Sequence, residues 1–531
     1  MVILIPVIVL IVGALTAAIM YRLRANTALI WLISVGLVAI AWVSVLVLRW
    51  RLPMAISSRN WFLAGTPGDA LEFSFSVLSF PYIFAFIGML LAILLTATAR
   101  LKQQSIPATW AANMALAAIT VLSLMASTPL GLILSWVVLD LTEVIIIFLA
   151  PTEQVDKGRS LVAFAVKMAG TLLIVAALVV SRAEGVWLSL DQPTQLTGLM
   201  LILAAGLRLG LLPLYVPFER ELPLRRGLGL MIRMASPISA MMLLARLPAG
   251  LLTASMTGWL MVFASLSALY GAVIWAARAD ALNHRPYWVL AMTGLAFLTV
   301  LHGQAESGIA WGIALLTSGG IASLYSVRNR RLMILPALSS FILVGVPYTP
   351  LAVGWQGLTA GPIDIATISS ILIVSLLLVG YVRDMLKPGE DPDTLDPWIR
   401  AVYPIGLVVL VITPWIIWLW DIANVQLFSG WWGSLAAVVL ASIGLSLIFI
   451  KGKESIFPKT GWIKVVSQPV GKLISSAMSL NWLYRLFWGI YRMVQWVIQA
   501  FTSLVEGDGG FIWTMVFLAL LVSLFGMVSG Q

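Results

Sequence analysis

Apolar runs of about 20 residues recur along the whole chain, and they constrain its fold more than any other feature. A helix of this length crosses a hydrocarbon core of roughly 30 Å. Backbone N–H and C=O groups find no water in that core, so a chain that crosses it must satisfy them internally, as a helix does. The sequence therefore predicts an all-α integral membrane protein that passes through the lipid bilayer many times.

The composition agrees with this interpretation. Hydrophobic residues make up 61% of the chain and charged residues 10%, whereas a soluble domain has about 25% charged residues. The formal net charge of +10 does not indicate a nucleic-acid partner, because the basic residues lie in short loops between apolar runs, where they set membrane orientation. The first run, 2–21, lacks the flanks of a signal peptide, so we expect a retained span.

We predict sixteen membrane spans and two long segments that do not span. The stretch 49–77 is too polar. The stretch 469–505 would be about 55 Å long as a helix, and we predict an amphipathic helix along the cytoplasmic interface, or two short helices bent at Gly489. The predicted spans are residues 2–21, 26–48, 78–99, 107–126, 128–149, 160–181, 196–217, 228–246, 256–277, 286–303, 307–326, 331–351, 366–386, 403–420, 430–450 and 510–528.

The loops between these spans alternate in charge. Of the 32 basic residues, twenty-four fall on one side, three fall inside spans and five fall on the other side. The more basic side is predicted to be cytoplasmic, which places the chain in the inner membrane with both termini outside. The basic residues of the outer side are Arg49, Arg51, Arg59, Arg182 and Arg246.

The chain divides into five predicted segments. Residues 1–74 hold two spans and the outer excursion, and residues 75–386 form the core bundle. Residues 387–450 hold an acidic cytoplasmic loop and two spans. The interfacial helix occupies 451–509, and the last span occupies 510–531.

The sequence offers no cofactor or metal site. Without cysteine it has no disulfide, thiolate zinc site or thiolate-held iron–sulfur cluster. His284 and His302 lie at predicted helix ends, which argues against a haem held by both. We therefore expect no redox chemistry in this chain, although it could be a subunit of a proton-translocating oxidoreductase.

Five charged residues fall inside predicted spans. A charge near the middle of a bilayer costs roughly 2.5–3.5 kcal/mol on insertion scales, so it usually has a partner or a function. Two carboxylates, three residues apart, share a helix face, and helix rise places them at the level of two or three cations, slightly cytoplasmic of the midplane. The five residues are Asp140, Glu143, Lys167, Arg208 and Arg233.

This group suits a proton or cation relay, because a neighbouring positive charge can switch the proton affinity of a carboxylate. The alternative is a set of static, structural ion pairs. Arginine keeps its proton at any working pH, and Lys167 is the only lysine of the group. Arg233 also has the length to reach the cytoplasmic edge.

Three passages resemble a known family. In LILSWVVLDLTEVIIIFL (132–149), Asp140 falls at the glutamate of a Trp-Glu-Leu motif; in LAAGLRLGLLPLYVPFE (203–219), Arg208 falls at a lysine that precedes a Pro-Phe/Leu-His signature. GVPYTPLAVGWQGL (345–358) is similar to a Gly-Leu-Pro-Pro-Thr-x-Gly-Phe loop. Residues 75–385 thus resemble the antiporter-like membrane subunits of respiratory complex I, Mrp-type cation/proton antiporters and membrane-bound hydrogenases.

The resemblance implies an antiporter-like bundle with a lateral amphipathic helix before the last span. It also implies proton translocation within a larger complex, whose other membrane subunits, with redox or soluble proteins, would be the partners. Pro213 resembles the broken helix of the family, and Pro237 is a second candidate break; taken singly, Pro237 and Pro336 are more typical of ordinary kinks.

The departures from the family lie in the second half of the bundle. Leu358 stands where the family commonly has a lysine, and LLTSGGIASLY (315–325) replaces a His-x-x-x-Lys passage. A complete path would need water or hydroxyl groups in place of these charges. The candidate hydroxyls are Ser318, Tyr325, Tyr348 and Thr349.

The leading interpretation is therefore an antiporter-like subunit of a multi-subunit complex with an incomplete charge relay. One alternative is a non-conducting structural subunit of such a complex. Another is a membrane subunit for inorganic-carbon uptake beside a zinc-bearing soluble partner. A polytopic lipid or glycan transferase fits less well, because the long loops are amphipathic, or short and acidic.

Overall fold

The structure is a computed structural model of the chain, which falls into two units, Met1–Lys459 and Thr460–Gln531. Each unit is described by itself. The borders between predicted segments that fall within residues 1–459 stay predictions. The structure describes residues 2–58, 71–100, 107–149, 157–216, 226–277, 285–327, 329, 331–359, 361–387, 389–390, 395–421 and 430–450, with 489, 492, 493, 495, 496, 499, 515, 518 and 519 in the second unit.

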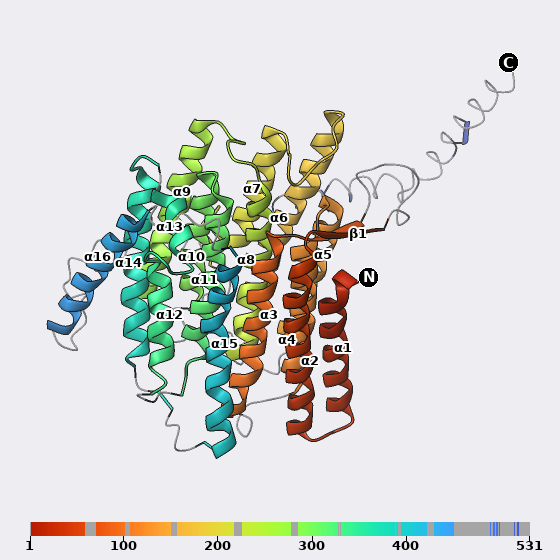
Figure 1. Cartoon of the computed structure of the whole chain (residues 1–531). Helices are drawn as coiled ribbons and strands as arrows, with labels where there is room; N and C mark the ends of the chain where they lie inside the picture. Colours follow the sequence, from red (N-terminus) through yellow and green to blue (C-terminus); the bar gives the residue numbers. More distant parts are fainter. Residues whose placement is uncertain are drawn as a thin grey trace. The chain divides into compact units, whose positions relative to one another are not determined.

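The first unit is a bundle of helices (Figure 1). In the described part of the chain, 11 helices are long and apolar enough to cross a membrane. The chain is thus an all-α, multi-pass membrane protein, as predicted. The helices are η1 (Val2–Leu4), α1 (Ile5–Arg22), α2 (Thr27–Leu48), η2 (Arg49–Arg51), α3 (Ser79–Thr96), η4 (Ala97–Arg100), α4 (Pro107–Met125), α5 (Pro129–Leu149), α6 (Lys157–Ala183), α7 (Gln195–Leu209), α8 (Arg226–Arg246), α9 (Ala254–Ala277), α10 (Arg285–Leu301), α11 (Ala305–Leu324), α12 (Ile334–Val344), α13 (Ala352–Thr359), α14 (Ile365–Met385), α15 (Pro397–Asp421) and α16 (Trp431–Ile450).

Two predicted elements lie mainly in the second unit, outside the described residues. The last span, 510–528, has three described residues, all helical. The interfacial helix predicted at 469–505 has six described residues, which are also helical. The position of this segment at the cytoplasmic interface stays a prediction.

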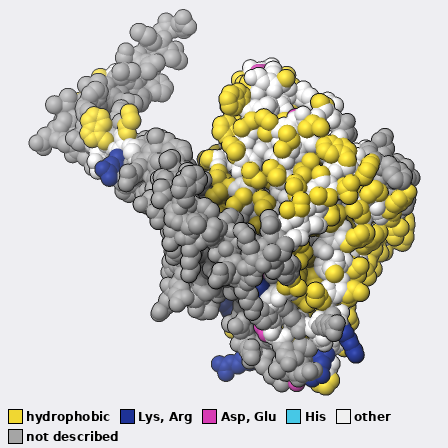
Figure 2. Space-filling model, turned by 90° about the vertical axis from the view of Figure 1, so that its left-hand side faces the viewer, with side chains coloured by type: hydrophobic (Ala, Val, Ile, Leu, Met, Phe, Trp, Pro, Cys, Tyr) yellow, Lys and Arg dark blue, Asp and Glu magenta, His cyan; other side chains and the backbone are white. Residues whose placement is uncertain are grey.

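Burial separates central from peripheral helices. The most apolar windows of α8 and α11 are 94% buried and that of α3 is 89% buried, against 33% for α1 and α2. Large apolar side chains such as Leu15 and Leu32 are exposed on the peripheral pair. Figure 2 shows hydrophobic side chains over most of the described part of one face, with lysines and arginines gathered at its lower end. This distribution fits a lipid-facing surface with a basic rim.

Two short strands pair beside the turn between α4 and α5. Strands β1 (Met54–Ser58) and β2 (Leu71–Phe75) pair antiparallel, with Met54 opposite Phe75. The backbone of β2 is hydrogen-bonded to the turn between α4 and α5, where the N–H of Ser127 donates to the Glu72 carbonyl over 3.0 Å. Arg246, at the end of α8, donates to the Ala126 carbonyl in the same turn. All of these segments were predicted to lie outside.

At the end of the bundle predicted to be cytoplasmic, one tyrosine hydroxyl bonds the backbone at the end of α11 and just after it. The Tyr403 hydroxyl, on α15, accepts from the N–H groups of Ser326 and Val327 at 2.8 and 3.2 Å, and donates to the Leu324 carbonyl at 2.9 Å. The N–H of Glu390 donates to the Ser326 carbonyl over 3.0 Å. Loops that the sequence assigns to the cytoplasmic side therefore contact one another.

Helix α7 is shorter than predicted. We expected a span over 196–217, but the helix ends at Leu209, with Gly210 in the left-handed region at φ +75°. The chain then turns, and Ser267 of α9 donates to the Leu211 carbonyl over 3.0 Å. Irregular backbone is tolerated inside a membrane bundle when neighbouring helices satisfy it in this way.

The span predicted at 331–351 is also broken. Helix α12 ends at Val344, with Gly345 at φ +68°, and the short α13 follows. The Trp355 indole N–H donates to the Val344 carbonyl over 2.8 Å, and that of Trp311 donates to the Gly354 carbonyl over 3.1 Å. The Trp355 side chain thus replaces a hydrogen bond that a continuous helix would have made at Val344. Pro336 lies in the first turn of α12, where proline is tolerated.

Candidate functional site

Asp140 and Arg208 form a buried ion pair between α5 and α7. The two guanidinium nitrogens of Arg208 donate to the two carboxylate oxygens of Asp140 at 2.7 and 2.8 Å. Both side chains are completely buried. Two parallel charge-assisted bonds fix the arginine in direction as well as in distance. The residues that the sequence placed at equal depth are therefore in contact.

Further contacts hold Arg208. One guanidinium nitrogen lies 3.4 Å from the Thr171 hydroxyl and 3.5 Å from the Lys167 carbonyl, both on α6. The guanidinium carbon lies 4.1 Å from the centre of the Trp136 ring, a favourable cation–π distance. With contacts to α5 and α6, Arg208 is a fixed charge.

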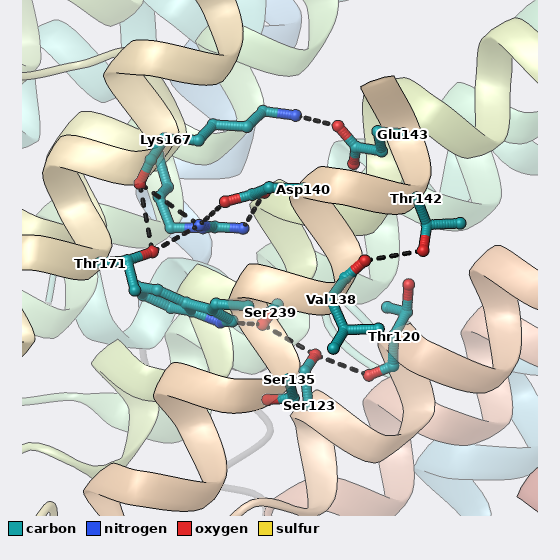
Figure 3. A network of polar contacts seen from close by, with 12 residues as sticks. Thr120, Ser123, Ser135, Val138, Asp140, Thr142, Glu143, Lys167, Thr171 and Ser239 are labelled. Atoms are coloured by element: carbon teal, nitrogen blue, oxygen red, sulfur yellow. Dashed lines mark hydrogen bonds and ion pairs between the residues drawn. The ribbon is translucent and has the colours of Figure 1, made fainter. Parts of the chain in front are cut away.

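Glu143 and Lys167 form the second buried pair. The Lys167 ammonium donates to Oε2 of Glu143, and both side chains are almost fully buried (Figure 3). The other carboxylate oxygen, Oε1, is buried without a hydrogen-bond partner. An unsatisfied buried acceptor costs about 1–3 kcal/mol and more when charged, so this oxygen can gain by taking a proton or a water molecule.

The four charges lie in a wider polar network (Figure 3). The Trp136 indole N–H donates to the Ser239 hydroxyl on α8, and Ser123 of α4 donates to the same hydroxyl over 2.9 Å. Ser123 is also placed to donate to the Thr120 carbonyl over 2.7 Å. The network therefore joins α4, α5, α6, α7 and α8. We call its four charged members, Asp140, Glu143, Lys167 and Arg208, the charge cluster.

Arg233 lies near the charge cluster and is buried, 8% exposed. It lines a cavity of about 20 Å³ together with Lys167 and Arg208, which is room for about one water molecule. The structure thus brings Arg233 towards the other four predicted residues. It also lines a second cavity with Arg226 and Arg285, the first residues of α8 and α10, so the alternative in which it reaches the cytoplasmic edge stays a prediction.

The two predicted helix breaks have different outcomes. Pro213 lies beyond the end of α7, in the irregular stretch that follows Gly210. Pro237 lies inside α8, which continues to Arg246, so the helix does not break there, and the alternative of an ordinary kink stays open. A proline removes only one backbone donor, and tight packing on all sides holds α8 together, since Pro237 and its neighbours are buried.

The hydroxyls considered for the second half of the bundle do not share one environment. Ser318 accepts from Ser339 over 3.1 Å in the buried interior, and Thr349 bonds the Val346 carbonyl next to it. Tyr348 is 53% exposed at a positive φ of 67°. Leu358, at the position of the family's lysine, is buried and apolar.

Sequence reasoning missed the residues that position the charges. Trp136 lies four residues before Asp140, and Thr171 lies four residues after Lys167, so helical spacing alone places each on its partner's face. Ser239 could not be found in this way, because its partner Trp136 lies on another helix, 103 positions away in the sequence. In the part of the chain that the structure describes, no group of three His, Asp or Glu residues could hold a metal ion.

Comparisons with known proteins agree on the fold. No protein-family profile matches the chain, and no curated protein sequence does so. A chain of the membrane-bound sulfane sulfur reductase, an archaeal respiratory membrane complex, superposes with a TM-score of 0.67 at 16% identity, covering 98% of this chain and 99% of that one.

Two further structures are similar. A chain of the Mrp complex from Dietzia sp. DQ12-45-1b gives a TM-score of 0.70 at 15% identity, over 100% of this chain and 63% of that one. A chain of respiratory complex I from Thermus thermophilus gives 0.58 at 15% identity, over 77% and 96%. The chain therefore has the fold of antiporter-like membrane subunits, which confirms the expected resemblance at the level of the fold.

Proposed function

We propose that this chain is an antiporter-like subunit of a multi-subunit membrane complex and takes part in proton or cation translocation through the charge cluster. The similar structures are chains of multi-subunit membrane complexes, which supports other membrane subunits as partners. The observation on which the proposal depends is the pairing of Glu143 with Lys167 inside the bundle.

The two ion pairs have different roles in this proposal. An arginine side chain keeps its proton, and Arg208 is held by two hydrogen bonds to Asp140, so this pair is fixed and adds no net charge. Lys167 can release a proton, and Glu143 has an unsatisfied oxygen that can accept one. Glu143 and Lys167 are therefore the groups whose protonation changes during translocation.

Access to this pair comes from the side predicted to be cytoplasmic. The cavity that Lys167, Arg208 and Arg233 line is large enough for about one water molecule. A water there would lie beside Lys167 and Arg208 of the charge cluster and beside Arg233. Arg233 lies in the first half of α8, whose beginning is predicted to face the cytoplasm. Such a water could pass a proton between the inner side and Lys167.

The test is ion uptake by sealed vesicles that hold the assembled complex. Replacing Glu143 by Gln puts an uncharged amide of similar shape in place of the titratable carboxyl group. We expect normal assembly and at least a tenfold loss of uptake. The matched control is Lys387→Ala, which breaks a lysine–carboxylate pair of 2.9 Å to Asp384 at the end of α14, and uptake should then be unchanged. Normal uptake by the Glu143→Gln complex contradicts the proposal.

One observation favours a non-conducting structural subunit instead. The second half of the bundle has hydroxyl pairs in its interior, such as Ser318 with Ser339 and Ser265 with Ser369 at 2.9 Å. The passage that holds Ser318, residues 315–325, lacks the charged groups that the resemblance leads us to expect. In a scaffold, Glu143→Gln would reduce assembly or stability and leave uptake per assembled complex unchanged. The same experiment therefore separates the two functions. A role in inorganic-carbon uptake stays a prediction that the identity of a soluble partner would test.

A further inference from the structure

A cavity of about 150 Å³ lies between α3, α11, α15 and the break between α12 and α13. It lies near the ends of these helices that are predicted to face outside, since Leu78, just before α3, and Glu306, in the first turn of α11, both line it. A cavity of about this volume holds one benzene-sized molecule, or about six carbon atoms. We call it the outer cavity.

The wall of the outer cavity is mostly apolar. Ile313 of α11, Ile342 of α12 and Ile417 of α15 contribute to it. Helices α12 and α15 pack against each other, and each also exposes large apolar side chains, such as Phe341 at 50% and Leu419 at 62%. The outer cavity is therefore bordered by helices that face lipid, and a hydrocarbon chain matches its wall.

Two polar groups interrupt this wall. Glu306 is the one charged residue among the described residues that line the cavity, and it is exposed. The indole N–H of Trp418 is buried without a hydrogen-bond partner. An acidic residue in the first turn of a helix is favourable by itself, so Glu306 alone does not indicate a ligand. The Trp418 N–H does, because a buried donor in the wall of a cavity costs free energy unless an acceptor reaches it.

The wall calls for a ligand with three parts, which are a hydrocarbon chain, an acceptor for the Trp418 N–H and a positive charge for Glu306. A phospholipid with an ammonium headgroup has all three, since its ester carbonyls lie between its acyl chains and its headgroup. The predicted depth agrees. Glu306 and Trp418 lie within about one turn of helix ends predicted to be outside, at the level of the headgroups, where tryptophan is enriched.

We propose that the outer cavity binds one phospholipid of the outer leaflet, with its ammonium group at Glu306, an ester carbonyl at Trp418 and part of an acyl chain inside. The apolar wall does not select this lipid, because the tails of the surrounding lipids are as apolar as the wall. Preference for it over other lipids therefore comes from Glu306 and Trp418. Its binding does not depend on whether the chain translocates ions.

A radiolabelled phosphatidylethanolamine with a photoreactive diazirine on one acyl chain tests the site on the purified full-length chain in detergent. We expect saturable cross-linking to the unmodified chain. Excess unlabelled phosphatidylethanolamine should compete with it, and phosphatidylglycerol, which has no ammonium group, should compete poorly. Mass spectrometry of the cross-linked peptides should place the lipid on the helices that line the outer cavity, such as residues 309–314 of α11.

Two variants separate the polar contacts. Trp418→Phe keeps an aromatic ring without the N–H donor and should weaken binding about fivefold, the effect of losing one neutral hydrogen bond. Glu306→Gln removes the charge and should weaken binding about threefold, since an exposed ion pair contributes less. The matched controls are Trp50→Phe and Glu184→Gln, at exposed residues that are also predicted to lie outside and do not line the cavity. Both should bind the lipid normally.

Thermal unfolding gives a second readout that needs no cross-link. Phosphatidylethanolamine should raise the unfolding temperature of the unmodified chain more than phosphatidylglycerol does, and Trp418→Phe should reduce the difference. Cross-linking that Trp418→Phe and Glu306→Gln both leave unchanged would place the lipid elsewhere and overturn the proposal. Equal competition by the two lipids would overturn it too. So would the absence of saturable cross-linking to the folded, unmodified chain, as expected if another part of the chain fills the cavity.

Discussion

At the scale of single residues, the charge cluster combines two kinds of ion pair. Arg208 bonds both oxygens of Asp140, whereas Lys167 bonds one oxygen of Glu143 and leaves the other unsatisfied. The difference follows from the side chains, because a planar guanidinium matches a carboxylate and an ammonium does not. A rigid pair beside a pair with an unsatisfied oxygen is compatible with the proton relay that we propose.

The rigidity of the Asp140–Arg208 pair leads to a prediction about stability. Asp140→Leu leaves Arg208 buried without its counter-charge and should lower the free energy of unfolding by about 3–5 kcal/mol. Adding Arg208→Met removes the orphaned charge, so the double variant should be more stable than Asp140→Leu alone. Denaturant unfolding of the purified chain in detergent measures both. A double variant no more stable than Asp140→Leu would show that the charges are not coupled.

Asp364 gives a pH-dependent prediction at the outer end. It lies before α14 and bonds the His302 ring over 2.8 Å and the N–H of Thr367 over 2.8 Å. Partial burial raises the pKa of Asp364, but the bonds from Thr367 and His302 outweigh it, and the net pKa lies below the ordinary value.

The ionised Asp364 carboxylate therefore stabilises the folded chain above the ordinary aspartate pKa of roughly 4. This contribution is lost as the pH falls through the lower folded-state pKa. We expect Asp364→Asn to be less stable than the unmodified chain near neutral pH, with a difference that shrinks towards acid. Unfolding temperatures over a pH series measure this difference, and one that grows towards acid would contradict the assignment.

At the scale of elements, hydropathy predicted where the chain crosses the bilayer but not where its helices break. The spans predicted at 196–217 and 331–351 were drawn through Gly210 and Gly345, because the flanking residues are apolar and a scale of hydropathy does not record backbone angles. The breaks are stable because side chains far away in sequence satisfy the freed carbonyls, as Ser267 does for Leu211. Contacts of this kind have no local signal.

A substitution at Gly345 tests whether the end of α12 depends on the backbone conformation of this glycine. Its φ is +68°, and an added Cβ would lie 2.6 Å from Trp355. Gly345→Ala should therefore lower the free energy of unfolding by about 1–3 kcal/mol. Gly36 in α2 is the control, because a Cβ there meets nothing within 4 Å, and Gly36→Ala should be neutral or stabilising by up to about 1 kcal/mol. Equal effects of the two substitutions would argue against a constrained break.

At the scale of the whole molecule, the sequence predicted the fold class, most spans and the residues of the charge cluster. Periodic hydropathy and loop charge depend on the bilayer as a solvent, so both are visible in one sequence. The antiparallel pair of β1 and β2 was predicted only as part of a polar excursion. Its pairing with the turn at Ser127 joins distant segments and has no counterpart in hydropathy.

The membrane orientation can be tested directly, because the chain contains no cysteine. Leu23 is 75% exposed in a loop predicted to be cytoplasmic, and Gln192 is exposed in a loop predicted to be outside. In intact cells, a membrane-impermeant thiol reagent should label Gln192→Cys and not Leu23→Cys. After permeabilisation both should react. Labelling of Leu23→Cys alone in intact cells would reverse the predicted orientation.

The central claim is that Lys167 releases and regains a proton during translocation. Lys167→Arg tests it most directly, because it keeps the positive charge facing Glu143 but removes a proton that can be given up. The measurement is ion uptake by vesicles that contain the assembled complex. Our account predicts normal assembly with uptake lowered at least tenfold. Uptake equal to that of the unmodified complex would contradict it.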